Sequence, residues 1–286
     1  MTNILRLGHR GSIEYNFTTN FIWRDVFLLR AAEYQGHLII QSDPDDPTYI
    51  FPSGSGDVKP VIDALILDAH AKGIPLTFNV VLNEDIKRLE ALYPGQFIYT
   101  PNRNDFDYVY TSDSLITLAG RKLSSKRNHI NRFIQQYPDW QYEPITKQNI
   151  SEAHEMSQAW CRENSYRENE TLYMESYAVE QAFQHYFDLN LTGALLRIRG
   201  KVIAVTMGEA LNDTTYVIHI EKALNGFQGA YQMINREFAA ANCSEYQYIN
   251  REDDAGDEGL RRAKLSYRPA MLIEKSSAVY IGEGTP

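Results

Sequence analysis

The sequence predicts an α/β (α+β) fold in two domains, each with a mixed, mostly antiparallel central sheet flanked by helices. Three observations support this prediction. The chain has 286 residues, more than one ordinary hydrophobic core holds. Strand-like and helix-like segments alternate along it. In the second half, three strand-like segments follow one another through short turns, with helical segments on either side.

The first domain is expected over residues 1–138 and has the less regular order of elements. Its first helix is predicted from an apolar, aromatic-rich stretch, and Asp57 and Asn83 mark the starts of two later helices. The predicted helices cover residues 20–34, 58–71, 83–93 and 115–137. The predicted strands cover residues 37–41, 48–51, 76–81, 97–100 and 107–110.

The second domain is expected over residues 139–286, because Pro138 ends the long helix 115–137. Gly200-Lys201 and Asn212-Asp213 are typical hairpin turns. The predicted strands cover residues 140–145, 193–199, 202–211, 215–220, 246–249 and 270–274. The predicted helices cover residues 149–164, 177–187, 229–242 and 259–265.

Composition excludes several classes of protein. The formal net charge of −9 makes general nucleic-acid binding unfavourable. There is no run of 18 apolar residues and no leader-like N-terminus, so we expect no membrane span and no secretion. The two cysteines, Cys161 and Cys243, are typical of a reducing compartment, and we expect a cytoplasmic protein without a Cys-rich metal site.

The turn after the third hairpin strand contains two glycines and leads into a helix. It reads Glu-Lys-Ala-Leu-Asn-Gly-Phe-Gln-Gly-Ala-Tyr over residues 221–231. Free backbone amides and the positive end of a helix dipole attract phosphate at such a place. The order of elements around it resembles that of the GNAT acyltransferase superfamily, which implies that the turn holds the pyrophosphate of acyl-CoA (coenzyme A). The expected contacts are Ala223, Gly226, Gln228, Gly229, Ala230 and Tyr231.

This turn departs from the superfamily pattern at two positions. Gly226 replaces the first polar residue, and Tyr231 replaces the final small one. The alternative is a glycine turn at a helix start that binds no ligand.

Two further segments, residues 107–133 and 250–269, resemble soluble relatives of the C-terminal domain of phosphatidylglycerol lysyltransferase. The resemblance covers the chain from about residue 52 to its end, and it implies two tandem GNAT-like domains related to Fem-type aminoacyl ligases. It also implies that the basic part of the predicted helix 115–137, residues 121–132, contacts tRNA or an anionic substrate. The basic residues of that helix are Arg121, Lys122, Lys126, Arg127, His129 and Arg132. The alternative is a solvated helix face.

The acidic loop 252–258 follows a predicted strand and precedes a helix, a place where α/β proteins bind ligands. Its carboxylates are candidates for binding an amine, accepting a proton or holding a cation. No His or Cys accompanies them, so we expect no metal beyond an open possibility of Mg²⁺. The candidate substrate-binding residues here are Asn250, Glu252, Asp253, Asp254, Arg261 and Lys264, with Lys126 and Arg127 on the basic helix.

Acyl transfer needs a base for the nucleophile and an acid for the leaving group. His219 and Glu221 are two residues apart on a predicted strand, so alternation places them on one face, and either is a candidate base. Glu209 on the neighbouring strand is a weaker candidate. Tyr267 stands near the position of a tyrosine acid in the superfamily. For each of these residues a purely structural role is the alternative.

We therefore expect an acyltransferase that moves an acyl group from acyl-CoA to an unidentified amine-bearing acceptor. Two alternatives remain open: an aminoacyl transferase fed by charged tRNA docked on the basic helix, and a tandem domain that binds a ligand without catalysis. The sequence does not specify the acceptor, the oligomeric state or whether the first domain has a working site.

Overall fold

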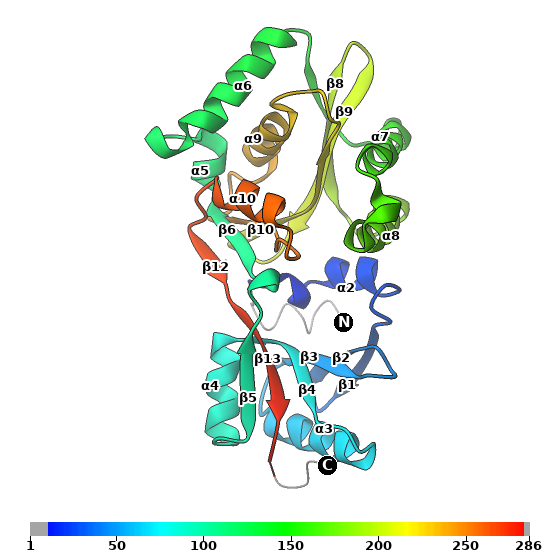
Figure 1. Ribbon diagram of the computed structural model, residues 1–286, viewed down its shortest axis with the longest axis vertical. Coiled ribbons are helices and arrows are strands. Elements are labelled where there is room, and N and C mark those ends of the chain that lie inside the picture. Colours follow the sequence, from blue (N-terminus) through cyan, green and yellow to red (C-terminus); the bar gives the residue numbers. More distant parts are fainter. Residues whose placement is uncertain (1–10, 283–286) are drawn as a thin grey trace. The chain divides into compact units, whose positions relative to one another are not determined.

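The computed structural model describes residues 11–282, which form two compact units (Figure 1). The first unit ends at Asp107 and includes the final strand from Ile273 onward, and the second is Tyr108–Leu272. Residues 1–6, on which the expectation of no leader rests, lie outside the described residues. Within the described part of the chain, no helix has the length and apolarity needed to cross a membrane.

The first unit is a six-stranded sheet with two long helices. Its sheet order is β1-β2-β3-β4-β13-β5, in which β3 and β4 are parallel and the other pairs antiparallel. The strands are β1 (Arg30–Tyr34), β2 (His37–Ser42), β3 (Thr48–Gly54), β4 (Thr77–Leu82), β5 (Phe97–Pro101) and β13 (Lys275–Tyr280). The helices are α2 (Phe17–Trp23), α3 (Lys59–Ala71) and α4 (Asn83–Leu92), with short 3₁₀ turns at Ile13–Tyr15 and Arg103–Asp105.

The second unit is a seven-stranded sheet of order β12-β6-β11-β10-β9-β8-β7. Figure 1 shows α7 and α8 on one side of this sheet and α5, α6 and α9 on the other. The strands are β6 (Asp107–Thr111), β7 (Gln141–Pro144), β8 (Thr192–Ile198), β9 (Lys201–Ala210), β10 (Thr215–Ala223), β11 (Tyr248–Asn250) and β12 (Met271–Ile273). The helices are α5 (Ser112–Thr117), α6 (Ser124–Gln136), α7 (Ile150–Glu163), α8 (Glu170–Gln184), α9 (Ala230–Asn242) and α10 (Glu258–Leu265), with 3₁₀ turns at Arg121–Leu123 and Tyr166–Glu168.

The two sheets have the same plan, which confirms the tandem GNAT-like fold. β8-β9-β10-β11-β6-β12 repeats the order of β1-β2-β3-β4-β13-β5. In each sheet the central parallel pair, β3/β4 or β10/β11, is joined through a helix, α3 or α9. The fifth strand of each sheet, in the order just given, comes from the part of the chain that forms the other sheet. The fifth strand of the second sheet, β6, directly follows β5 of the first sheet in the sequence, and the fifth strand of the first sheet, β13, directly follows β12 of the second.

Three details differ from the sequence prediction. The predicted helix 20–34 is α2 followed by strand β1, because Leu28 has a φ of 51° and the chain then pairs with β2. The predicted helix 115–137 is broken between α5 and α6 at Leu118 and Gly120, where φ is 49° and 81°. The strand β13 was not predicted.

The boundary between the units also differs from the expected one near Pro138. The units divide at Asp107 and Tyr108, because β6 pairs with β11 and both α5 and α6 pack against α9. The basic helix, expected within the first domain, therefore belongs to the core of the second unit.

Candidate active site at the divergence of β10 and β11

The parallel strands β10 and β11 separate in the middle of the second sheet. They pair over three residues only, Thr215–Val217 of β10, while β10 continues to Ala223. Beyond Asn250 the chain stays with β6, since the Arg251 amide donates to the Tyr108 carbonyl at 2.9 Å. This divergence brings polar side chains from several elements to the interior of the sheet.

A buried polar cluster lies on the α6 and α9 side of the divergence. Glu221 of β10 accepts hydrogen bonds from Asn235 of α9 and from Nη2 of Arg251, each at 2.8 Å. The Arg251 guanidinium lies 4.8 Å from the ring centroid of Tyr267, and the amine of Lys126 from α6 lies 4.0 Å from the same centroid. The structure thus brings together predicted candidates Glu221, Tyr267 and Lys126 and adds Arg251 and Asn235.

Two ionisable groups of the cluster have shifted pKa values. Burial, followed by the nearby positive charge of Arg251, lowers the pKa of the Lys126 amine to about 8, although Glu221 opposes the shift. Burial raises the pKa of the Tyr267 hydroxyl, so this group stays protonated at neutral pH and can act as a proton donor.

His219 lies on the other side of the sheet. A β-bulge between Ile218 and Ile220 interrupts the alternation of β10, and the His219 side chain contacts Glu209, which faces away from α9. The expectation that His219 and Glu221 share a face is therefore wrong.

His219 is also held as a cation. Its ring nitrogens lie 2.8 Å from Glu252 and 3.3 Å from Glu209, and its side chain is 1% exposed. Burial alone would lower the His219 pKa, but the two carboxylates outweigh it and raise the pKa to about 9. A protonated imidazole between two carboxylates is suited to bracing the sheet and not to accepting a proton.

The predicted phosphate turn exists, since β10 ends at Ala223 and α9 begins at Ala230. Two parts of this turn that could contact a phosphate are already in contact with other residues of the protein. The Asn225 amide donates to the Glu163 carboxylate at 2.8 Å. A Cβ on Gly229, whose φ is 91°, would lie 2.6 Å from the His129 carbonyl of α6, so close helix packing explains this glycine.

The remaining turn residues divide by exposure. Gly226 and Gln228 are exposed, whereas Ala223 and Ala230 are buried. The Tyr231 hydroxyl accepts a hydrogen bond from the Trp160 indole at 2.8 Å, on the α7 side of the sheet. Tyr231 therefore fills the position of the expected small residue with a side chain bound to the protein.

The acidic loop forms an internal scaffold. Asp254 is fully buried and accepts hydrogen bonds from Tyr108, from the Gly256 amide and from Arg261 at 2.9 and 2.7 Å. Burial would raise the Asp254 pKa, but these donors lower it to about 2. Lys264 donates to the carbonyl oxygens of Arg251, at 2.6 Å, and Asp253.

The other loop candidates also bond within the loop or to its neighbours. The Asn250 side chain accepts from the Glu252 amide at 2.7 Å, and Asp253 accepts from the Ala255 amide at 2.8 Å. The loop therefore fixes the position of Arg251, which sequence reasoning missed although Arg251 lies inside the quoted segment 250–269.

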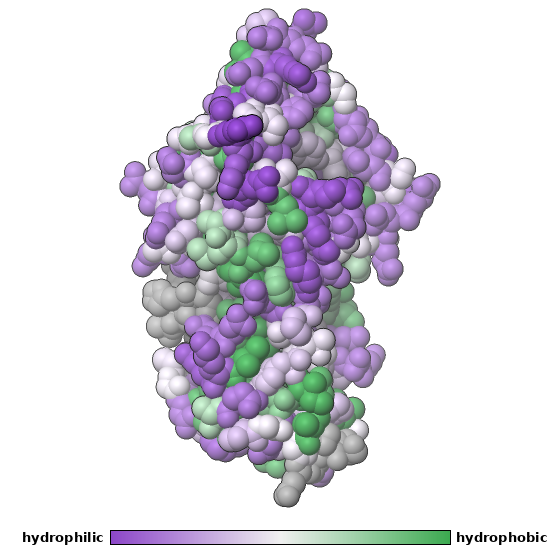
Figure 2. Space-filling view, turned by 60° about the vertical axis from the view of Figure 1, so that its left-hand side comes forward, coloured by the Kyte–Doolittle hydropathy of each residue, from purple (hydrophilic) through white to green (hydrophobic). Residues whose placement is uncertain are grey.

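The basic helix presents fewer free charges than predicted. Lys126 is buried, and Arg127 donates to the carbonyl oxygens of Leu118 and Gly120, which stabilises the break before α6. Three exposed basic residues remain on this segment: Arg121, Lys122 and Arg132. The surface at this end of the second unit is mainly hydrophilic (Figure 2).

A groove of about 980 Å³ lies between α7 and α8 on the opposite face of the sheet. The tyrosines Tyr166, Tyr173 and Tyr177 line it, with Tyr166 and Tyr173 stacked and the hydroxyls of Tyr173 and Tyr177 2.7 Å apart. Glu168 and Glu180 add carboxylates to its wall, and Arg162 and Arg167 add guanidinium groups. The sequence contains only a weak signal for this groove. Tyr173 and Tyr177 are four residues apart, as on one face of a helix, but the predicted helix begins only at residue 177, whereas α8 begins at Glu170.

Lys222 lies close to this groove. Its amine is 3.8 Å from the ring centroid of Trp160 in α7 and 2.6 Å from Glu175 in α8. Cys161 also lines the groove, and burial raises the pKa of its thiol, so it is not activated as a nucleophile. Among residues 11–282, no group of three or more His, Cys, Asp or Glu side chains is arranged to hold a metal ion.

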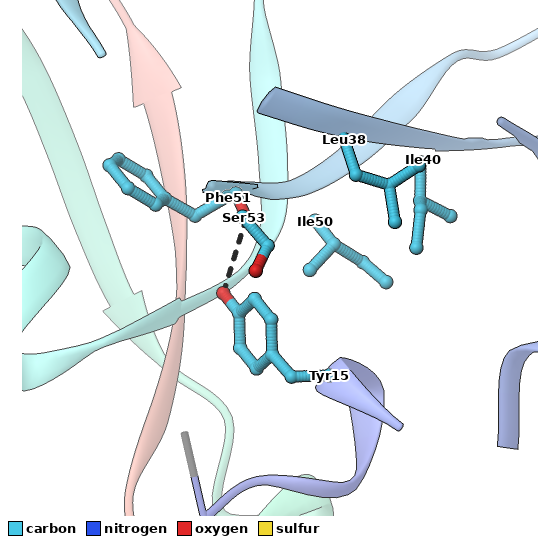
Figure 3. A pocket seen from close by; sticks show the side chains of 6 residues that line it. All are labelled: Tyr15, Leu38, Ile40, Ile50, Phe51 and Ser53. Carbon is cyan, nitrogen blue, oxygen red and sulfur yellow. Dashed lines mark hydrogen bonds between the residues drawn. The ribbon is translucent and has the colours of Figure 1, made fainter. Parts of the chain in front are cut away.

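The equivalent divergence in the first unit is apolar. β3 and β4 pair at Tyr49 and Ile50, after which Phe51 packs against Phe78 with ring centroids 5.7 Å apart. The gap beside Phe51 and Ser53 is too small to admit water (Figure 3). The polar cluster of the second unit thus has no counterpart at this position.

Comparison with known proteins agrees with this architecture. The family model described as "Phosphatidylglycerol lysyltransferase, C-terminal" matches residues 5–279. The chain belongs to this family. A crystal structure of a conserved protein of unknown function from Bacteroides thetaiotaomicron is 38% identical, with a TM-score of 0.93 over 98% of this chain and 95% of the other.

More distant relatives share the fold. The L-PGS structure from Bacillus licheniformis is 16% identical, with a TM-score of 0.66 over 97% of this chain and 90% of the other. An uncharacterised protein of Mycoplasmoides gallisepticum is 23% identical over 193 residues, and the match spans 60% of that relative's length. Family and fold together establish an acyltransferase-type architecture.

Proposed function

We propose that this chain transfers an aminoacyl group from an ester donor to an acceptor that carries an amine or a hydroxyl. The observation that carries the proposal is the buried Glu221–Arg251 ion pair, with Lys126 and Tyr267 beside it, where β10 and β11 diverge. Buried charged groups are costly in the middle of a sheet, so their presence there suggests a chemical role. The family name supports an aminoacyl group, since it describes a lysyl transfer to phosphatidylglycerol.

The turn before α9 favours an aminoacyl-tRNA donor over acyl-CoA. In the expected CoA site, Glu163 already takes the Asn225 amide, and α6 packs directly on Gly229. The Glu163 carboxylate would repel a phosphate of CoA. That phosphate would have to displace Glu163 before it could accept a hydrogen bond from the Asn225 amide. The exposed residues Arg121 and Lys122 leave a modest cationic surface for a tRNA phosphate.

The transfer needs one proton acceptor and one proton donor. The acceptor's nucleophile attacks the ester carbonyl, a new C–N or C–O bond forms, and the ester C–O bond to the donor breaks. Glu221 takes the proton from the nucleophile, since each carboxylate oxygen keeps a free lone pair beyond its bond to Asn235 or Arg251. Tyr267 donates a proton to the leaving oxygen and recovers one from Glu221 through solvent.

The groove between α7 and α8 suits the aminoacyl group or an amine-bearing acceptor. Tyrosine faces attract an ammonium group. The charges of Glu168 and Glu180 in the lining are balanced by those of Arg162 and Arg167, so the tyrosines are what favours a cation here. Lys222, which reaches from β10 toward Trp160, lies one residue from Glu221 on the opposite face of the strand.

A transfer assay tests the proposal. The protein is incubated with tRNA carrying a radiolabelled amino acid, or with labelled acetyl-CoA, together with phospholipid vesicles or a set of amines. We expect label to pass from aminoacyl-tRNA to an acceptor, and Glu221→Gln to reduce the rate at least about 100-fold. Glu245→Gln, an exposed glutamate after α9, is the matched control and should retain the wild-type rate. Transfer from acetyl-CoA alone would reverse the choice of donor, and transfer from neither donor would refute the proposal.

A further inference from the structure

The cluster around Glu221 contains two basic side chains and one carboxylate. Arg251 is 11% exposed and uses Nη2 for Glu221, whereas its Nη1 is buried without a hydrogen-bond partner among the described residues. Lys126 is 8% exposed, and in the described part of the chain its amine contacts the Tyr267 ring but forms no hydrogen bond or ion pair. Two cationic groups from different elements therefore lie beside the same ring, that of Tyr267, and have donors without acceptors among the described residues.

This arrangement is energetically unfavourable unless something completes it. A buried donor without an acceptor costs about 1–3 kcal/mol, and more when it is charged. Folded proteins satisfy the great majority of such groups. The buried cation of the first unit is satisfied, since Lys275 pairs with both Glu14 and Asp107. Arg251 differs from it, because its Nη1 is a buried cationic donor without a hydrogen-bond partner among the described residues.

We propose that Lys126 Nζ and Arg251 Nη1 together bind a phosphate ester. One phosphate offers several acceptor oxygens, so a single anion can satisfy both donors. A guanidinium supplies planar donors and an ammonium supplies a compact charge, and both are preferred partners of phosphate. A phosphate ester is also the group that a nucleotide donor and a phospholipid acceptor share. Its assignment to a substrate rests on the proposed transferase function, whereas the anion site rests on the geometry alone.

The charge state of Lys126 makes this binding dependent on pH. Three charged or titratable groups face its amine: Arg251 after β11, Glu221 of β10 and Tyr267 after α10. The Lys126 pKa is lowered to about 8 in the free protein, and a bound anion favours the protonated amine. Affinity is therefore highest below pH 8 and falls above it. The second pKa of a phosphate monoester is near 6, so the charge of the ligand stays constant over that range.

Calorimetric titration of the full chain with glycerol 3-phosphate, AMP and acetate, at pH 7 and pH 9, tests the proposal. We expect the phosphate esters to bind the wild-type protein and acetate to bind more weakly. Affinity should fall about tenfold between pH 7 and pH 9. Lys126→Met should weaken phosphate-ester binding at least about tenfold. Lys87→Met, an exposed lysine on α4 of the first unit, should leave it unchanged.

The outcomes separate the possible sources and the possible failures. Tighter binding of glycerol 3-phosphate would assign the site to a phospholipid headgroup, and tighter binding of AMP would assign it to a nucleotide donor. Equal affinity in wild type and Lys126→Met, or no loss above pH 8, would overturn the proposal. If Lys126→Met fails to fold, the pH series on the wild-type protein still decides it. Phosphate-ester binding without transfer from any donor would refute the proposed function and leave this site standing.

Discussion

The two units repeat one strand order but fill its centre with different chemistry. Where β3 and β4 part in the first unit, Phe51 and Phe78 pack against each other. Where β10 and β11 part in the second, Glu221 and Arg251 form a buried ion pair. The difference shows that the same strand order, with the same divergence of its central strands, can enclose either an apolar core or a polar cluster. We infer that the first unit serves as scaffold and the second carries the reaction.

Buried charges show the same contrast. In the first unit, Lys275 lies between two carboxylates, Glu14 and Asp107, each at 2.6 Å. In the second, Glu221 pairs with Arg251, whereas Lys126 contacts the Tyr267 ring and forms no ion pair among the described residues. The first arrangement is complete and the second is open to a ligand.

The largest expected effect comes from breaking the complete arrangement. Lys275→Met leaves Asp107 buried without its cation, so we expect a loss of about 3–5 kcal/mol in the free energy of unfolding. Lys72→Met, which removes an exposed pair with Asp68, should cost no more than about 0.5 kcal/mol. Urea denaturation measures both. A small loss in Lys275→Met would remove the contrast between the two buried clusters.

The second effect concerns pH and His219. The folded pKa of His219, about 9, lies above its ordinary value, so its contribution to stability is full below about pH 6.5 and is lost as pH rises through 9. We expect unfolding free energy to fall by about 3 kcal/mol over this window. Urea denaturation at a series of pH values measures this decline. In the variant His219→Gln, the unfolding free energy should no longer fall over this pH range. An unchanged decline in the variant would show that another group causes it.

The third effect tests the close packing of α6 on the turn before α9. Gly229→Ala and Gly226→Ala both place a side chain at positive φ, which costs about 1 kcal/mol. The Cβ of the first also meets the His129 carbonyl, whereas the second points into open space. We therefore expect thermal unfolding to show about 1–3 kcal/mol more destabilisation in Gly229→Ala. Equal effects would indicate that Gly229 is kept for another reason.

The smallest effect concerns one unpaired buried group of the first unit. The Ser53 hydroxyl in the first unit has no hydrogen-bond partner among the described residues, and the gap beside it admits no ligand. Ser53→Ala should therefore change stability by less than about 1 kcal/mol, in either direction, and leave transfer activity intact. A loss of activity without unfolding would contradict the scaffold role of the first unit.

Much of the fold could be predicted from the sequence, because local signals determine it. The hairpin turns Gly200-Lys201 and Asn212-Asp213 locate β8, β9 and β10, and glycine and capping patterns locate the start of α9. Strand β1 and the exchanged strand β13 could not be predicted, because their pairing depends on partners distant in the chain or on a single positive φ.

The site was predictable only in part. Glu221 and Tyr267 are candidates from the sequence that the structure places in one cluster. The bulge in β10 reverses the face of His219, and no local signal marks a bulge at that residue. Lys126 belongs to a basic segment that reads as a solvated face, and its burial follows from the packing of α6 against α9. The missed Arg251 becomes a site residue through a scaffold of buried hydrogen bonds that composition does not reveal.

The central claim is that the divergence of β10 and β11, and not that of β3 and β4, holds the reacting group. A crystal structure with a stable, amide-linked analogue of 3′-aminoacyl adenosine tests it most directly. The account predicts density for the aminoacyl group beside Glu221 and Arg251. Density between β3 and β4, or a fully occupied ligand confined to the surface away from both divergences, would contradict it.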